Sequence, residues 1–349
     1  MITADPAHET RRSPQVVASS EPSSGLKLII QIPCFNEEGT LAQTLADLPR
    51  RVDGFDVVEW LVVDDGSTDR TVEVAKAAGV DYVVSLPYNK GLARAFMTGL
   101  EAALIHGADV IVNTDADNQY SAKCIEDLVR PIQRGSAQIV VGARPIKEIG
   151  EFSFMKKWLQ RLGSYVVRLA SGTDIPDAPS GFRAIHREAA LQLNVFGDYT
   201  YTLETIIQAG RKSIPITSVP IEINAATRPS RLVKSIPKYV YRSILSIARI
   251  FVLYKPLRFF FFIGMLLFIP GFLVGARFLY DYSTGNGAGH IQSLILASIL
   301  IITAVIVVSA GVLSDLIAAN RLLLEEIRMR QIRYGSARGA DLIEKQARQ

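Results

Sequence analysis

Two long runs of apolar residues constrain this chain more than any other feature of its sequence. Phe259–Ala276 and Ile291–Ser314 contain no charged side chain, and each is near or above the ~18 residues that a helix needs to cross a bilayer. Helices buried in a large soluble core are the alternative. Two neighbouring runs, in a chain with a mean hydropathy of +0.22, favour the membrane, so we predict two transmembrane helices over residues 256–320.

The cations that flank these runs predict how the chain crosses the membrane. Lys255 and Arg258 precede the first run and Arg321 follows the second, whereas the short Gly-rich loop between the runs has Arg277 as its nearby cation. Lys and Arg accumulate on cytoplasmic flanks. We therefore expect a multi-pass protein of the inner (plasma) membrane, with both long ends in the cytoplasm and the loop outside.

Charge and cysteine content narrow the remaining possibilities. The net charge of +4 is too small to indicate a nucleic-acid partner. Two cysteines, Cys34 and Cys124, form no disulfide framework, which fits a reducing cytoplasm. Residues 1–25 lack the apolar core of a signal peptide and are polar and rich in Ser and Pro, so they are predicted to form a disordered tail.

Strand and helix patterns alternate from residue 26 onward. Strands are expected at residues 26–33, 57–65, 81–87, 109–115, 137–144 and 214–223, with helices at 37–48, 67–79, 91–107, 124–132 and 154–170. Residues 171–187 are expected to form a loop that leads to a strand. This order predicts an α/β domain with a Rossmann-like, mostly parallel sheet and helices on both faces. Residues 231–255 combine helical apolar spacing with cations, which is typical of amphipathic helices in a membrane surface, and a soluble packing helix is the alternative.

A polar cluster follows each of the first five expected strands. The clusters are PCFNEE, DDGSTD, NKG, DADNQ and ARP, in chain order. Because ligands bind beyond the carboxyl ends of the strands in open α/β sheets, we predict the active site at this edge.

The stretch NTDADNQY, residues 113–120, is the strongest candidate for a metal site. Asp115 and Asp117 supply the two carboxylates that Mg²⁺ sites commonly combine with substrate phosphates, and the amide of Gln119 adds an oxygen. An ordinary polar turn is the alternative for Asp-x-Asp alone. Its position at a strand end, beside the other clusters, favours Mg²⁺ or Mn²⁺.

The DDGSTD cluster predicts two roles. Asp64 and Asp65 leave an apolar strand where at least one of them can accept hydrogen bonds from a nucleobase or ribose, and Asp65 is favoured for this contact. Gly66 permits a tight turn. The three residues that follow, Ser67, Thr68 and Asp69, are expected to cap the next helix.

The motifs IPCFNEEGTL, VVDDGSTDRT, NKGLARAFMTGL, DADNQY and VGARP, in this order, resemble glycosyltransferase family 2, which has the GT-A fold. The resemblance extends over about residues 26–232 and implies a nucleotide-diphosphate sugar and an Asp-x-Asp metal site. APSGFRAIHR and TRPSRL further resemble segments of dolichol-phosphate mannose synthase and the bacterial polyprenyl-phosphate glycosyltransferases. The expected layout is a cytoplasmic catalytic domain (26–230), juxtamembrane helices (231–255), two spans (256–320) and a cytoplasmic tail (321–349).

The resemblance also assigns roles to individual residues. The nucleotide-sugar pocket would comprise Pro33, Asn36, Glu37, Asp64, Asp65 and Asp115. The metal would be held by Asp115, Asp117 and Gln119. The acceptor phosphate would be met by Arg144, Ser180, Arg228 and Arg231, and catalysis would rest on Asp117, Arg144, Ser180 and Arg228. Asn118-Gln119-Tyr120 departs from the Leu-Gln-His/Asp of many members, and we expect this change to affect the acceptor side rather than the metal.

General chemistry supports a phosphate acceptor. A lipid phosphate is already an oxyanion and needs no general base to attack an anomeric carbon. The reaction needs alignment and neutralisation of the leaving diphosphate, which a metal ion supplies, and arginine binds the acceptor phosphate with a forked, permanently charged donor set. The Gln-x-x-Arg-Trp motif of processive synthases is absent, because Trp60 and Trp158 lie in other contexts.

We therefore predict inverting transfer of one sugar, from a UDP- or GDP-linked donor to a polyprenyl phosphate such as undecaprenyl phosphate, at the cytoplasmic membrane face. A hydroxyl acceptor is the alternative and would require a base, with Glu204 or Asp198 as candidates. A non-catalytic membrane protein of the same fold is a third hypothesis, which the intact Asp115, Asp117 and Arg144 disfavour. The small-xxx-small spacing of Gly271 and Gly275 would permit spans to pair in a homo-oligomer.

Overall fold

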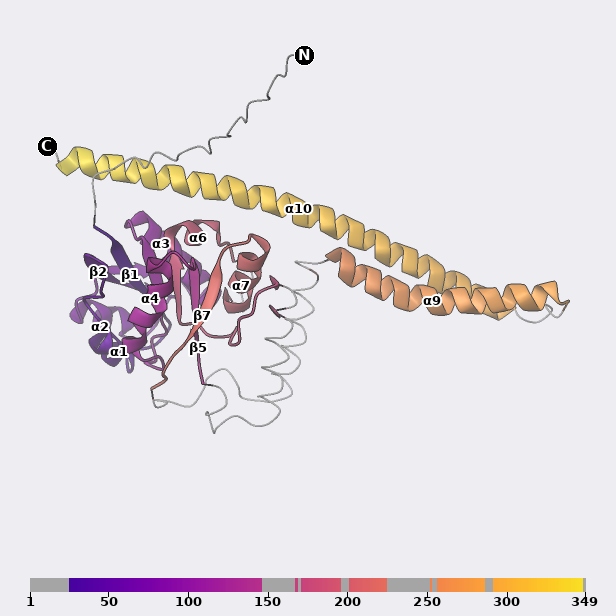
Figure 1. Cartoon of the computed structure of the whole chain (residues 1–349), viewed down its shortest axis with the longest axis horizontal. Coiled ribbons are helices and arrows are strands. Elements are labelled where there is room, and N and C mark those ends of the chain that lie inside the picture. The colour runs from indigo at the N-terminus through magenta and orange to yellow at the C-terminus, as the bar shows by residue number, and fades with distance from the viewer. Residues whose placement is uncertain are drawn as a thin grey trace, which may run out of the picture.

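The protein folds into an α/β domain followed by a helical hairpin (Figure 1). The structure, a computed structural model, describes residues 25–145, 167–168, 171–195, 201–224, 252, 256–285 and 291–347. The strands are β1 (Lys27–Cys34), β2 (Val57–Asp64), β3 (Tyr82–Ser85), β4 (Val110–Asn113), β5 (Ile139–Ala143), β6 (Arg183–His186) and β7 (Ile216–Pro220). Strands β1 to β5 and β7 lie where the apolar runs of the sequence predict strands.

One seven-stranded sheet orders these strands as β3-β2-β1-β4-β6-β5-β7. All neighbours are parallel except at β6, which runs antiparallel to both β4 and β5. The register places Arg183 of β6 opposite Asn113 of β4 and Val141 of β5. The predicted α/β class and mostly parallel sheet are therefore confirmed, whereas the insertion of β6 between β4 and β5 is a feature that strand order along the chain does not predict.

Helices cover both faces of the sheet. The helices of this domain are α1 (Leu41–Asp47), α2 (Thr71–Ala77), α3 (Leu92–Ile105), the 3₁₀ turn η1 (Ala122–Cys124), α4 (Ile125–Gln133), α6 (Arg187–Gln192) and α7 (Tyr201–Arg211). Buried residues of α1, α2 and α4 share one core with Leu28, Ile30 and Ile32 of β1. Buried residues of α3, α6 and α7 share the other core with Ile29. Alternate side chains of β1 are thus buried on opposite faces, as expected for a central strand of a parallel sheet.

The first helix begins later than the sequence pattern predicts. Helical periodicity begins at Glu37, but α1 begins at Leu41. Asn36 has a left-handed backbone (φ +55°), and Thr40, the residue before α1, has a non-helical φ of −120°. The carbonyl of Glu37 accepts the N–H groups of Thr40 and Leu41. Residues 35–40 therefore form a turn that leaves their polar groups beside the strand ends.

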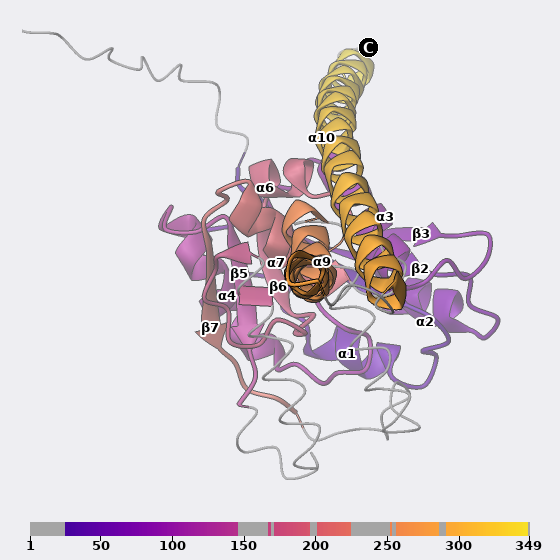
Figure 2. The ribbon, with the colours of Figure 1, turned by 90° about the vertical axis from the view of Figure 1, so that its right-hand side faces the viewer.

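The C-terminal hairpin consists of α9 (Pro256–Ser283) and α10 (Ile291–Ala347), which pack side by side (Figures 1 and 2). Pro256–Ser283 and Ile291–Asn320 are long and apolar enough to cross a membrane. Most of their large apolar side chains are exposed, unlike those of a soluble core helix. Beyond these residues α10 continues unbroken to Ala347 and passes α3 and α6.

The glycines of α9 face α10 of the same chain. A Cβ on Gly271 would lie 2.9 Å from the Cβ of Leu300, and one on Gly275 would lie 3.6 Å from the Cβ of Ala297. Small residues permit this close approach of two helices. Their spacing is therefore accounted for by packing within the hairpin and no longer argues for pairing between protomers.

Candidate active site

The polar clusters meet at one edge of the sheet, as predicted. Strands β1 to β4 are parallel, and β5 runs in the same direction because two antiparallel pairings separate it from β4. The carboxyl ends of these five strands therefore share an edge. The reversed direction of β6 brings its amino end, with Ser180 and Gly181 just before it, to the same edge. This last contribution comes from the strand whose position the sequence does not reveal.

The loops after β1 and β2 are joined through Asn36. Its backbone N–H donates to Ser67 Oγ (2.9 Å), and its Oδ1 accepts the N–H of Thr68 (2.9 Å). Ser67 and Thr68, which are predicted from the sequence to cap α2, bind Asn36 instead. Asp69 accepts the N–H of Thr71 (3.0 Å) at the start of that helix. Two adjacent loops of the predicted nucleotide pocket therefore form one unit.

Pro33 and Glu37 border this unit. Pro33 is buried near the end of β1. Glu37 is half-buried and its carboxylate accepts the hydroxyl of Thr40 (2.8 Å), within the turn that precedes α1. Both residues lie at the strand-end edge where the resemblance places the nucleotide.

The carboxylates of Asp64 and Asp65 are both buried and both accept backbone hydrogen bonds. Asp64 accepts the N–H of Ser67 (2.9 Å), which closes the turn at Gly66 (φ +73°). Asp65 accepts the N–H groups of Lys90 (2.8 Å) and Gly91 (2.9 Å), just before α3. Asp65 thereby links the loop after β2 to the loop after β3, a role that sequence patterns do not reveal because it depends on β2–β3 pairing.

Asp115, Asp117 and Gln119 follow β4 on one short loop and are all half-buried. The loop is tight: Asp117 Oδ1 accepts the N–H of Gln119 (3.2 Å), across Asn118. Asp115 lies against the amino end of β6, because a Cβ on Gly181 would be 3.1 Å from its Oδ1. The structure therefore brings together the three residues predicted to hold a metal.

The electrostatics of Asp115 are unusual for an aspartate. Burial and the neighbouring charge of Asp117 raise its pKa to about 7, although Arg144 and a hydrogen bond from Tyr120 favour the charged form. Tyr120 is also buried, its hydroxyl accepts the N–H of Gly181 (3.1 Å), and its ring stacks on Phe182. A cation bound between Asp115 and Asp117 would reduce the repulsion between their carboxylates and so stabilise the loop.

This donor set fits a divalent cation that is completed by a substrate. No group of three His, Cys, Asp or Glu side chains forms a metal site among the described residues. Two carboxylates and an amide oxygen at the loop 115–119 leave coordination positions for phosphate oxygens, which is the arrangement that Mg²⁺ prefers. The repulsion between Asp115 and Asp117 supports the assignment of this loop to a divalent cation.

Arg144 is held by a buried carboxylate. Its Nε and Nη2 donate to Asp177 Oδ2 (2.7 Å) and Oδ1 (3.0 Å), and its backbone N–H donates to Oδ2 (3.2 Å). Asp177 is 1% exposed and Arg144 is 15% exposed. Burial opposes the charge of Arg144, but the hydrogen bonds and charge of Asp177 outweigh it and raise its pKa. The guanidinium is thus a permanent cation in a fixed place, and its charge favours the ionised form of Asp115.

Two buried residues, Ser180 and Arg183, lie within or beside the loop 177–181. Ser180 is fully buried; its Oγ lies close to the Tyr120 hydroxyl but forms no hydrogen bond of good geometry among the described residues. Arg183, also fully buried, donates to the carbonyls of Ser180 (2.9 Å) and Ala178 (2.9 Å) and to the hydroxyl of Thr205. Burial lowers the pKa of Arg183 to about 10. Arg183 and Asp177 therefore shape the loop 177–181, and sequence patterns gave no sign of either role.

The other predicted residues fall into two groups. Arg228, Arg231, Asp198 and Trp158 lie outside the described residues, as do the predicted helices at 154–170 and 231–255 except for residues 167–168 and 252, which are helical. Glu204 lies in α7 and is 7% exposed, next to the Thr205 that binds Arg183. Its burial suits a structural acid of the helix better than a base open to an acceptor.

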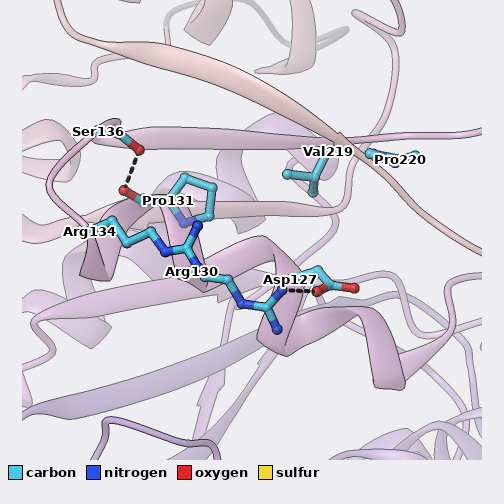
Figure 3. A pocket seen from close by; sticks show the side chains of 7 residues that line it. All are labelled: Asp127, Arg130, Pro131, Arg134, Ser136, Val219 and Pro220. Carbon is cyan, nitrogen blue, oxygen red and sulfur yellow. Dashed lines mark hydrogen bonds and ion pairs between the residues drawn. The ribbon is translucent and has the colours of Figure 1, made fainter.

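A pocket of about 380 Å³ lies between α4 and β7 (Figure 3). It is lined by Asp127, Arg130, Pro131, Arg134, Ser136, Val219 and Pro220. Arg130 is paired with Asp127 within the helix, and the Ser136 hydroxyl donates to the Pro131 carbonyl (Figure 3). None of the predicted site residues lines this pocket, so the candidate active site is assigned to the loops that follow the strands at the carboxyl edge of the sheet.

Comparison with known proteins gives a consistent result. Residues 29–193 match the model of Glycosyl transferase family 2. The chain is 31% identical to a UDP-N-acetylglucosamine–dolichyl-phosphate N-acetylglucosaminyltransferase of Methanococcus voltae, over 55% of this chain and 83% of that protein. It is 26% identical to a dodecaprenyl-phosphate galacturonate synthase of Rhizobium johnstonii, over 86% of this chain and 90% of that protein.

A solved structure supports the fold. The glucosyl-3-phosphoglycerate synthase of Mycobacterium tuberculosis, in complex with Mn²⁺, UDP and phosphoglyceric acid, superposes with a TM-score of 0.51 and 24% identity. The superposition covers 64% of this chain and 78% of that one. At this identity the likeness concerns the fold, which is the predicted GT-A arrangement.

Proposed function

The chain belongs to glycosyl transferase family 2, and from this premise we propose that it transfers one sugar from a nucleotide-diphosphate donor to a polyprenyl phosphate. The observation that carries the proposal is the pairing of opposite charges at the strand-end edge. The acidic loop of Asp115 and Asp117 and the fixed guanidinium of Arg144 follow β4 and β5 at the same edge, and the charges of Asp115 and Arg144 affect each other's pKa. One side suits a metal-bound diphosphate and the other an anionic acceptor.

The donor would occupy the loops that Asn36 and Asp65 hold together. The loop of Asp115, Asp117 and Gln119 would bind Mg²⁺ or Mn²⁺ against the diphosphate, where the ion neutralises charge on the leaving group. The M. tuberculosis neighbour was solved with Mn²⁺ and UDP, which supports a divalent ion and makes UDP the first donor to test, ahead of GDP.

The acceptor would approach from the side of Arg144 and Ser180. Arg144 supplies a charge that does not titrate near neutral pH, and its two side-chain hydrogen bonds to Asp177 hold it in place. Arg228 and Arg231 are proposed to complete the acceptor site. Alignment of the acceptor oxygen with the anomeric carbon is the main contribution expected from these residues.

The chemistry is a single displacement. A non-bridging oxygen of the lipid phosphate donates an electron pair to the anomeric carbon, while the bond from that carbon to the leaving diphosphate oxygen breaks and its electron pair departs with the diphosphate. Attack and departure on opposite faces invert the anomeric configuration. No proton must be removed from the acceptor, which agrees with the burial of Glu204.

The apolar hairpin would place this reaction at a membrane. The names of the two relatives described above refer to polyprenyl-type phosphates, and the R. johnstonii enzyme aligns over 86% of this chain. We propose that the catalytic domain lies on the cytoplasmic face of the inner membrane, where lipid carriers can reach Arg144, and that undecaprenyl phosphate is the acceptor.

The test uses the full-length protein in detergent with Mn²⁺ or Mg²⁺ and undecaprenyl phosphate. A panel of UDP- and GDP-sugars is supplied, and mass spectrometry detects a lipid-phosphate-linked sugar. We expect a metal-dependent product with one donor. Metal-dependent nucleotide binding without any lipid product would contradict the phosphate acceptor and direct the search to hydroxyl acceptors.

A further inference from the structure

Asn118 has an uncommon conformation at the centre of the acidic loop. It has a left-handed backbone (φ +53°) and is 6% exposed, between Asp117 and Gln119. Asparagine adopts this conformation more readily than most residues. The bond from the N–H of Gln119 to Asp117 Oδ1 (3.2 Å) closes a turn around it. The conformation of Asn118 therefore sets the relative placement of its two neighbours.

Helix α1 holds this loop from one side. The hydroxyl of Thr44 donates to the carbonyl of Ala116 (2.9 Å), and Asn118 Nδ2 donates to Asp47 Oδ2 (2.7 Å). Thr44 and Asp47 are three residues apart and so lie on one face of the helix. Because α1 directly follows the turn of Asn36 and Glu37, these bonds connect the acidic loop to the proposed nucleotide side.

The segment after β7 holds the loop from the other side. Asn224 Nδ2 donates to the carbonyl of Asn118 (2.9 Å), and the N–H of Asn224 donates to the carbonyl of Gln119 (2.9 Å). Tyr120 and Ile223 form an antiparallel bridge beside these bonds. Arg228, a proposed acceptor residue, is four positions further along the chain. These bonds connect the acidic loop to the segment that leads to the proposed acceptor side.

We propose that Asn118 is a positioning residue, which with Asp47 and Asn224 fixes the acidic loop for divalent-cation binding and joins it to both substrate sides. The inference rests on the proposed function for its cation and its substrates. It revises the expectation that Asn118 affects the acceptor side alone, because the side-chain amide that replaces the common leucine bonds to α1. Groups that orient metal ligands in this way commonly affect metal affinity strongly.

The test measures Mn²⁺ affinity of the full-length protein in detergent by the electron paramagnetic resonance signal of free Mn²⁺, with UDP and with GDP. Asn118→Gly keeps the left-handed backbone but removes the side chain, and Asn224→Asp keeps the shape but removes the donor to the Asn118 carbonyl. We expect each variant to bind Mn²⁺ on the order of tenfold more weakly. Equal affinity in both variants and the wild type would overturn the proposal.

A charge-exchange pair separates positioning from a general structural effect. Asn118→Asp alone places a carboxylate opposite Asp47 and should weaken Mn²⁺ binding, whereas adding Asp47→Asn restores a hydrogen bond with donor and acceptor exchanged and should recover most of the affinity. Tighter binding by Asn118→Asp alone, or no recovery in the double variant, would contradict the proposal.

Gln133→Ala is the matched control. It also removes an amide that donates to a distant backbone carbonyl, that of Asp53, but at the exposed end of α4. Its Mn²⁺ affinity should equal that of the wild type, and a loss as large as that of Asn224→Asp would show that any lost amide bond acts alike and would overturn the assignment.

The readouts also separate this inference from the proposed function. A wild-type protein that makes the lipid-linked sugar, with variants of unchanged Mn²⁺ affinity, would refute the positioning role alone. A wild-type protein that makes no such lipid, but loses Mn²⁺ affinity in the variants and regains it in the charge-exchange pair, would refute the acceptor alone. A wild-type protein that binds no Mn²⁺ with either nucleotide would refute the positioning role.

Discussion

Two pairs of aspartates lie at the carboxyl ends of strands β2 and β4, on the same edge of the sheet, and they differ in their surroundings. Asp64 and Asp65, after β2, receive three backbone N–H groups from Ser67, Lys90 and Gly91. Asp117, after β4, accepts the N–H of Gln119, and burial and the charge of Asp117 raise the pKa of Asp115 in spite of Arg144 and a hydrogen bond from Tyr120. Backbone donors thus satisfy the first pair, whereas the carboxylates of the second pair repel each other.

This difference separates acids that shape a loop from acids that would bind the proposed cation. Backbone N–H donors stabilise a carboxylate at Asp65 without any ligand. At Asp115 burial and Asp117 raise the pKa to about 7, so the unliganded site is under electrostatic stress that a cation relieves. The same residue type at the same sheet edge thus has two different environments, and these depend on which loops supply backbone donors.

The largest expected effect is the loss of transfer in Asp117→Ala. Removing one of two carboxylates from the acidic loop removes preorganised charge stabilisation, and we expect turnover to fall by roughly a thousandfold or more. The protein should stay folded, since the variant also relieves repulsion of Asp115. Product formation by mass spectrometry and the melting temperature in detergent measure the two quantities. Substantial remaining turnover would reject Asp117 as a metal ligand.

A second variant, Asp177→Asn, tests whether a structural acid can act on catalysis through a cation. It removes the charge that compensates Arg144, which is 15% exposed, and loss of one partner of a buried pair costs roughly 3 kcal/mol. We expect a lower melting temperature and a raised KM for the lipid phosphate, with a smaller change in the KM for the nucleotide sugar. Equal changes in both KM values would show that Asp177 supports the fold alone.

Asp65→Asn tests the compensated pair. An amide oxygen can replace one acceptor but not both, so the loop before α3 loses part of its support, at a cost of about 1–2 kcal/mol in the free energy of unfolding. Mn²⁺ affinity should change far less than in Asp117→Ala, which is the matched comparison at the other strand end. If Asp65→Asn abolished Mn²⁺ binding while leaving the melting temperature unchanged, the division between the two pairs would be wrong.

Much of the fold follows from local patterns. Apolar runs with β-branched residues locate β1 to β5 and β7, and glycines with positive φ end α2 and α3 at Gly79 and Gly107, as predicted. The position of β6 does not follow, because pairing of Asn113 with Arg183 joins residues far apart in the chain. An antiparallel strand inserted between parallel ones has the same apolar pattern as a parallel strand.

The site was predictable where its residues act from their own strand end. Asp115, Asp117 and Arg144 follow β4 and β5 directly, and their type and position point to charge recognition. Asp177 was not predictable, because its role comes from a contact with Arg144 across 33 positions. Arg183 was not predictable either, since nothing local indicates that an arginine beside Phe182 is fully buried and holds the loop 177–181 by its carbonyls.

The smallest expected effect is a pH dependence of stability that distinguishes Asp115 from the compensated pair. Its pKa is about 7 in the folded protein, above the ordinary value of 3.8. Between about pH 4 and pH 7 the folded state therefore keeps a proton that the unfolded state has lost, so raising the pH through this window destabilises the fold. Because Asp115 is half-buried rather than sealed from solvent, we expect a loss of about 1 kcal/mol.

The measurement compares melting temperatures of the wild type and Asp115→Asn across this pH range without divalent cations. The amide does not titrate, so the wild type should lose stability relative to the variant as the pH rises. Adding Mn²⁺ with UDP near pH 7 should stabilise the wild type more than the variant, because the variant keeps only the Asp117 carboxylate for the ion. Parallel pH curves for the two proteins would show that Asp115 is compensated like Asp65, and the contrast between the two aspartate pairs would then fail at its central residue.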